Sequence, residues 1–207
     1  MKASYVRLMG PHAGEAFAEL MQDAARLHLK WNEFLALFAG GPAQIDTLNE
    51  AAPGFFYLVS EAWWNSLILH IFRMTDGNRT VLSLVTLTKL LPAALRAGYE
   101  PKLKLALAAS RFAHDLRHAD IGHRNREVAL SAKPLPRSSR EQISKAIAAI
   151  DDALHFVDYH YTGHEAPIYD HLDIQGGAVA MLWIVRRGLR ARDDDFTAHR
   201  PPMRFTD

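Results

Sequence analysis

The chain has 207 residues, a length that suits one folded domain with a hydrophobic core of its own. Hydrophobic residues make up 49% of it and charged residues 23%, which excludes wholesale disorder. The net charge is +1 with neutral histidines, so any affinity for nucleic acid has to come from a local patch. The absence of cysteine excludes disulfides, thiolate catalysis and cysteine-ligated zinc.

The N-terminal segment lacks the uninterrupted apolar stretch of a signal peptide, so we expect a cytoplasmic protein. The most apolar run, residues 54–72, contains Glu61, Asn65 and His70. Polar and ionisable side chains of this kind are costly at bilayer depth. The run therefore predicts a buried core helix, and we expect no membrane association.

Apolar residues recur every three or four positions almost throughout, with no convincing strand pairs, and this predicts an all-α bundle of about five to six helices. We expect a single domain over residues 1–207, with a connector at 43–52, loops at 76–80 and 131–139, and a tail at 193–207. The predicted helices, in chain order, cover residues 12–39, 53–75, Ser83 to Gly98 with an interruption near Pro92, Pro101 to the polar stretch at 117, 139–160 and 176–192.

The densest group of chemically active side chains is RHADIGHRN, residues 117–125. On a continuous helix Arg117 and His123 would lie about 120° apart around the axis, so they would not share a face. They could converge if the helix broke at Gly122, or across a two-fold axis between two copies of the chain. Asp120 could orient His123 or pair with Arg124 on the helix surface.

These residue types suit metal-free cleavage of RNA. The 2′-hydroxyl has to lose a proton as it attacks the phosphate, the leaving oxygen has to gain one, and a fixed cation has to stabilise the developing charge. Histidine can hold either proton role near neutral pH. Arginine stays protonated and presents a planar fork to phosphate oxygens.

An arginine, a polar residue, about four further positions and a histidine form the signature of the HEPN superfamily of helical domains, and RHADIGH at 117–123 resembles it. The resemblance extends to the abortive-infection-like (AbiU-type) branch of that superfamily and covers about residues 20–130. It is carried upstream by LHLKWNEFLALF at 27–38, LNEAAPGFFYLV at 48–59, LILHIFRMTD at 67–76 and the segment that starts with LSL at 82–84.

The resemblance implies a helical bundle that dimerises so that two motifs face each other. Many members are metal-independent ribonucleases of phage-defence or toxin systems, and others are non-catalytic modules or antitoxin partners. Carried over, Arg117 would be the phosphate-binding cation and His123 the general acid or base, with His118 at the polar position. His118, Asp120, Arg124 and Asn125 would support the site or bind RNA. The expected partners are RNA or nucleotide, a second copy and an antitoxin or other protein, with no cofactor and no metal.

Other interpretations stay open. Arg117 and His123 could be solvated helix residues, a polar contact at a dimer interface, or part of a module that binds nucleotide, RNA or protein without turnover. Histidine pairs four residues apart, His114 with His118 and His160 with His164, have a spacing that can bind a divalent metal. The second pair lies close in sequence to Asp158, Glu165, Asp170, His171 and Asp173. Arg73 and Asp76, three residues apart, are predicted to pair at a helix end.

Overall fold

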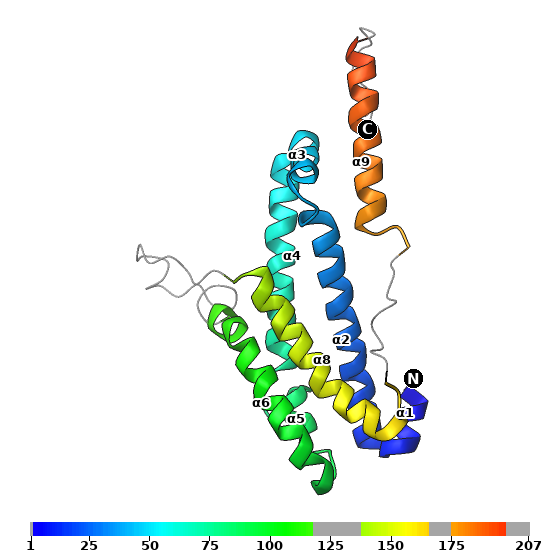
Figure 1. Cartoon of the computed structure of the whole chain (residues 1–207), viewed down its shortest axis with the longest axis vertical. Coiled ribbons are helices and arrows are strands. Elements are labelled where there is room, and N and C mark those ends of the chain that lie inside the picture. Colours follow the sequence, from blue (N-terminus) through cyan, green and yellow to red (C-terminus); the bar gives the residue numbers. More distant parts are fainter. Residues whose placement is uncertain (1, 118–137, 166–174, 198–207) are drawn as a thin grey trace. The chain divides into compact units, whose positions relative to one another are not determined.

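The computed structural model describes residues 2–117, 138–165 and 175–197 (Figure 1). Over these residues the chain is helical and contains no strand, which confirms the all-α prediction. Eight helices are present in the described part, more than the five to six predicted. They are α1 (Lys2–Met9), α2 (Pro11–Phe38), α3 (Pro42–Ala51), α4 (Pro53–Met74), α5 (Leu84–Leu87), α6 (Ala93–Leu116), α8 (Arg140–Thr162) and α9 (Ala178–Thr197).

The additional helices come from short segments. The predicted first helix is α2, but residues 2–9 form α1 before it, and Gly10, with φ of 82°, separates the two. A positive φ costs glycine little, so the chain can turn between the helices there. The predicted connector at 43–52 is mostly the helix α3, with Pro42 in its first turn, a position that needs no backbone N–H.

The largest error concerns α6. Gly98 and Pro101 predicted the end of one helix and the start of another, yet α6 passes through both and has Pro101 inside it. Gly98 has a packing role instead. A Cβ atom built there would lie 2.5 Å from the ring of Phe156 on α8, so the missing side chain lets the two helices approach closely.

The chain divides into two compact units. The first contains Met1–His28 and Trp64–Leu172, and the second contains Leu29–Trp63 and Asp173–Asp207. The long helices α2 and α4 therefore contribute residues to both. That residues 1–207 form a single domain stays a prediction, because the division into two units records only which residues pack together.

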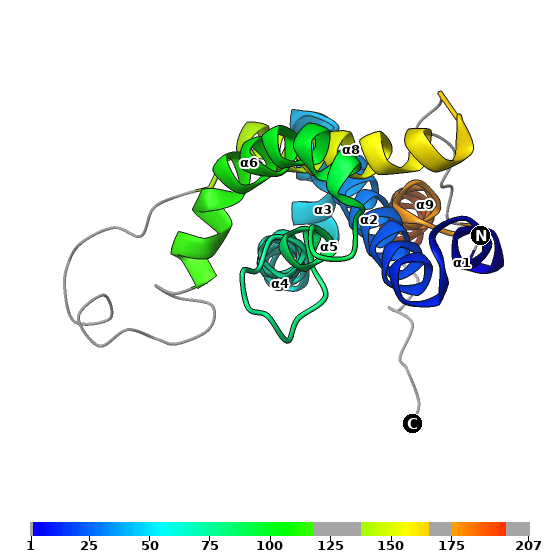
Figure 2. The same ribbon diagram turned by 90° about the horizontal axis from the view of Figure 1, so that it is seen from below.

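In the first unit α6 and α8 lie side by side and run in opposite directions (Figures 1 and 2). Tyr5 of α1 packs edge-to-face on Phe17 of α2, with ring centroids 4.9 Å apart. Its hydroxyl donates a 2.6 Å hydrogen bond to Asp158, a fully buried carboxylate of α8. The start of α8 is fixed by a capping box, in which Ser139 accepts from the backbone N–H of Gln142 and Gln142 accepts in return.

The second unit has a smaller apolar cluster. Its buried members come from α2, α3, α4 and α9, and they are Leu37, Leu48, Phe56, Ala178 and Leu182. The carboxylate of Glu33 accepts a hydrogen bond from the backbone N–H of Ala178 and so satisfies a donor at the start of α9. An ion pair between Arg192 and Glu50 links α9 to α3.

Candidate functional site

Arg117 is the predicted site residue that the structure describes, and it lies immediately after the last residue of α6. Its backbone keeps helical dihedrals, and its N–H reaches the carbonyls of Ala113 and His114. The guanidinium carbon lies 4.8 Å from the ring centroid of Phe72, over the face of that ring. A cation over an aromatic face is attracted by the ring quadrupole, so Phe72 restricts where the charge of Arg117 is presented.

His114 lies one helical turn before Arg117 and contacts the same aromatic ring. The two ring centroids, of His114 and Phe72, are 4.7 Å apart at an interplanar angle of 62°. Phe72 and Thr75 are at the end of α4, so the ends of α4 and α6 are joined by these side chains.

Thr75 fixes the orientation of the His114 ring. The Thr75 hydroxyl donates a 2.8 Å hydrogen bond to the carbonyl of Ile71, and the same oxygen lies 3.0 Å from Nε2 of His114. Because the Thr75 hydroxyl donates its proton to this carbonyl, its oxygen can only accept a hydrogen bond from His114. Nε2 of His114 is therefore the donor and carries a proton. That nitrogen is engaged within the fold, and the alternative of a metal bound by His114 and His118 is not tested because His118 lies outside the described residues.

The other predicted members of the site, His118, Asp120, His123, Arg124 and Asn125, lie outside the described residues. Their roles, and the convergence of Arg117 with His123, stay predictions. The prediction from sequence named Arg117 but not Phe72 or Thr75, whose side chains contact the end of α6. Their distance along the chain from Arg117 explains this, since no local spacing relates them.

A network of charged side chains lies between α2 and α4. Arg73 was predicted to pair with Asp76, and this is wrong: its guanidinium contacts Asp23 of α2, with an N–O distance of 3.4 Å. The buried ring of His70 lies 4.0 Å from the same carboxylate oxygen, and Asp76 instead accepts from the backbone N–H of Asn78. Arg73 thus pairs with a carboxylate of a neighbouring helix and not with Asp76, the partner expected from sequence.

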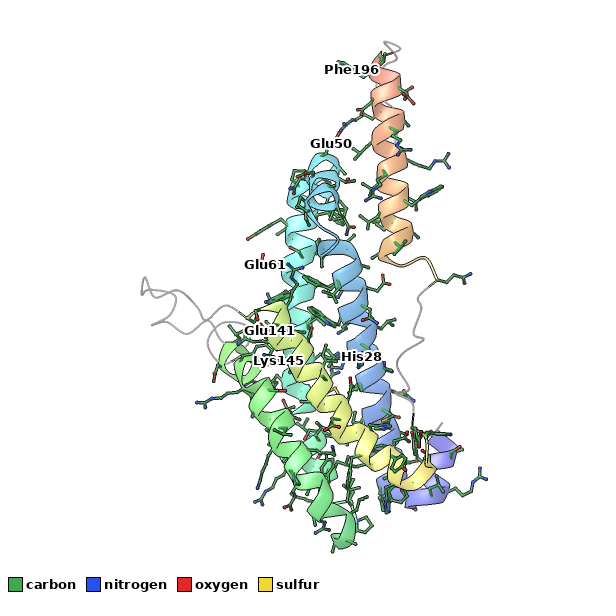
Figure 3. The ribbon with its side chains drawn as sticks, viewed as in Figure 1. His28, Glu50, Glu61, Glu141, Lys145 and Phe196 are labelled. Carbon is green, nitrogen blue, oxygen red and sulfur yellow. The ribbon has the colours of Figure 1, made fainter. Side chains whose placement is uncertain are left out.

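A second contact between α2 and α8 involves titratable groups. Nε2 of His28 lies 2.6 Å from Oδ2 of Asp151, and Figure 3 shows His28 on α2. Burial raises the pKa of Asp151, while the hydrogen bond and charge of His28 act in the opposite direction. The pair connects the helices in the interior of the first unit.

The second proposed histidine pair has no metal-binding arrangement in the described part of the chain. Over residues 2–117, 138–165 and 175–197, no three histidine, aspartate or glutamate side chains are grouped to hold a metal ion. Asp158 points into the core toward Tyr5, while His160 and His164 are exposed. Asp170, His171 and Asp173 lie outside the described residues.

A cavity of about 330 Å³ lies beside the last turns of α6, at the end that carries Arg117. Its apolar wall and its polar rim come from α6 and from the start of α8. The lining residues are Ala108, Ala109, Arg111, Phe112, Asp115, Leu116, Ser138 and Gln142. No pattern in the sequence connects Arg111 and Asp115 with the start of α8.

Comparison with known proteins identifies the family. The HEPN family described as AbiU2 matches residues 11–181. The chain belongs to this HEPN family. The match is longer than the stretch of about 20–130 expected from sequence motifs, because it also includes α8 and the start of α9. No curated protein and no solved structure matches the chain significantly.

Membership of the HEPN family fits the all-helical architecture and the position of Arg117 at a helix end. None of the helices in the described ranges is sufficiently long and apolar to span a bilayer.

Proposed function

We propose that this HEPN protein is a metal-independent endoribonuclease of the phage-defence or toxin type. The observation that carries the proposal is the placement of Arg117 in a HEPN chain, at the end of α6 with its guanidinium held over Phe72. A fixed, permanently charged fork at a helix end is suited to binding a phosphate group.

The chemistry assigned to the motif needs three functions. A base removes the proton of the 2′-hydroxyl while its oxygen forms a bond to phosphorus. The bond from phosphorus to the 5′-oxygen breaks, and an acid returns a proton to that oxygen. Arg117 stabilises the charge that develops on the phosphate oxygens, and His123 serves as the base or the acid.

Two copies of the chain supply the pair of proton-transfer groups. One motif offers His123 once, whereas cleavage uses a base and an acid at the same phosphate. A homodimer with Arg117 and His123 of each copy facing those of the other provides both, and His118, Asp120, Arg124 and Asn125 would surround the bound RNA. An antitoxin or another protein partner would control this site.

The decisive experiment compares RNA cleavage by the wild type, His123→Ala and Arg117→Ala in the presence of a chelator. Both variants should lose at least about 100-fold in rate, because acid–base and charge-stabilising groups each contribute on that scale. His12→Ala is the matched control, since His12 is an exposed histidine of α2. Circular dichroism and size-exclusion chromatography check the fold and the dimer.

Equal cleavage by all four proteins would contradict the assignment of the site. A stable complex with RNA that forms equally well with His123→Ala, and without turnover in any variant, would instead identify a non-catalytic binding module.

A further inference from the structure

The cavity at the end of α6 has the composition of a base-binding pocket. Its floor and wall contain Ala108, Ala109, Phe112 and Leu116, so they offer an apolar surface that includes an aromatic ring. Its volume of about 330 Å³ is at the small end of ligand pockets, which run from roughly 300 to 1,000 Å³. A volume of this size accommodates one nucleobase.

The polar rim contains one acceptor of hydrogen bonds among several donors. Asp115 presents a carboxylate, which only accepts when ionised, and Arg111 presents a guanidinium, which only donates. The two residues are four positions apart on α6, so they lie on the same side of the helix. Both side chains are exposed to solvent.

Contacts within the fold decide which atoms Ser138 and Gln142 can offer. The Ser138 oxygen accepts a 2.8 Å hydrogen bond from Nε1 of Trp64, so its own hydroxyl proton remains for a ligand. The Gln142 side-chain oxygen accepts from the backbone N–H of Ser139 at 2.8 Å, so its amide nitrogen remains to donate. Both residues therefore add donors to the rim.

We propose that this cavity binds a guanine base of an RNA strand whose neighbouring phosphate is held at Arg117, an inference that rests on the proposed ribonuclease function. Guanine presents adjacent N–H donors, which suit the carboxylate of Asp115. It also presents the acceptors O6 and N7, which suit the fork of Arg111 or the donors of Ser138 and Gln142. Adenine, cytosine and uracil lack the two adjacent N–H donors that guanine has on N1 and N2.

The position of the cavity connects base recognition with the cleavage site. Only Leu116 separates Asp115 from Arg117, and Leu116 itself lines the cavity. Residues two apart on a helix point about 200° apart, so Arg117 faces away from the cavity side of α6 and would hold the phosphate of a neighbouring nucleotide past the helix end. Cleavage would then occur next to guanosine.

The test measures binding of the four nucleoside monophosphates, GMP, AMP, CMP and UMP, to the full chain carrying His123→Ala, by calorimetry. GMP should bind at least about fivefold more tightly than the other three, since one good bidentate contact discriminates by roughly 5- to 150-fold. Adding Asp115→Asn should remove that preference, because the amide presents a donor to guanine's donors. Asp46→Asn, which makes the same charge change on the exposed face of α3, should leave it intact.

The outcomes separate this inference from the ribonuclease assignment. Equal binding of all four monophosphates, no binding of GMP at millimolar concentration, or an unchanged preference in Asp115→Asn would overturn the guanine pocket. RNA cleavage without preference for guanosine would also overturn it and leave the ribonuclease standing. Selective GMP binding that depends on Asp115, together with no cleavage by the wild type, would support the pocket and reject the ribonuclease.

Discussion

The helices α8 and α9 have similar lengths but very different surroundings. α8 has 23 residues and buries eight of them, whereas α9 has 20 residues and buries only Ala178 and Leu182. α8 begins with a capping box and ends at Gly163 in the left-handed conformation, so its own sequence satisfies both ends. The first turn of α9 instead receives Glu33 from α2.

Several large apolar side chains of α9 are also exposed. Val179 is 72% exposed, Trp183 is 59% exposed and Phe196 is 84% exposed. The two helices are stabilised differently. α8 has capping residues of its own and buries much of its surface, whereas α9 is held by a few contacts from residues distant in the chain. We therefore expect α8 to unfold only when the first unit unfolds, whereas the folding of α9 should depend on a small number of contacts.

The largest expected difference in the free energy of unfolding comes from truncating one buried side chain of each helix to alanine. Ile150 of α8 is fully buried, so Ile150→Ala should lower the free energy of unfolding by about 2–5 kcal/mol. Leu182→Ala in α9 should lower it by roughly half as much, because the small cluster around it can collapse into the space. Urea unfolding measures both effects. A larger loss for Leu182→Ala than for Ile150→Ala would contradict the comparison.

A glycine in each setting gives a smaller and more selective test. Gly188 is inside α9 with open space where a Cβ would be, so Gly188→Ala should stabilise that helix by about 0.5–1 kcal/mol. Gly98→Ala should stabilise α6 by about 1 kcal/mol less than Gly188→Ala stabilises α9, because the new methyl group displaces the Phe156 ring that packs there. Hydrogen exchange of the amides of α9 and α6 reports the two changes.

A double variant isolates the cause at Gly98. In a Phe156→Ala background, Gly98→Ala should show the ordinary gain of replacing glycine by alanine within a helix. If the shortfall persisted without the Phe156 ring, close approach of α6 and α8 would not be its origin.

The smallest expected effect concerns the polar groups that α8 buries and α9 does not. Burial raises the pKa of Asp151 above its ordinary value, so the folded chain holds that proton more tightly than the unfolded chain does. The stability contributed by Asp151 is therefore fully present below the ordinary aspartate pKa of about 3.9, and it is lost as the pH rises through the raised value. The thermal midpoint of the wild type, relative to Asp151→Asn, should fall over this window.

His28 provides the control for this pH dependence. Its hydrogen bond and charge lower the pKa of Asp151, so His28→Ala should extend the loss of stability to higher pH. A difference between the wild type and Asp151→Asn that stays constant with pH would show that the carboxyl group has the same pKa in the folded and unfolded chains.

Local patterns in the sequence predicted the helices well where the chain supplies its own boundaries. Residues 53–75 were predicted and α4 covers Pro53–Met74, while Ser139 was correctly placed at the start of α8. Prediction failed at Gly98 and Pro101, where a neighbouring helix, and not the local sequence, determines the role of the glycine. The interruption predicted near Pro92 is present, since α5 ends at Leu87 and α6 begins at Ala93 with Pro92 at its N-cap.

The candidate site shows the same division between local and distant information. The motif located Arg117 at a helix end from spacing alone. The contact of Arg117 with Phe72, and the meeting of Asp115 with Ser138 and Gln142, depend on how α4 and α8 pack on α6. No local periodicity contains that information, since the residues concerned are far apart in the chain.

The antiparallel pairing of α6 and α8 has a consequence for how such proteins can diverge. Leu116 and Ser138 line one cavity, so the chain leaves and re-enters the scaffold at nearly the same place. The entropy cost of closing a loop between two fixed anchors grows slowly with its length, by about 0.6 kcal/mol for each doubling. Relatives could thus exchange or lengthen the sequence between these two anchors, motif included, while the helices beneath stay the same.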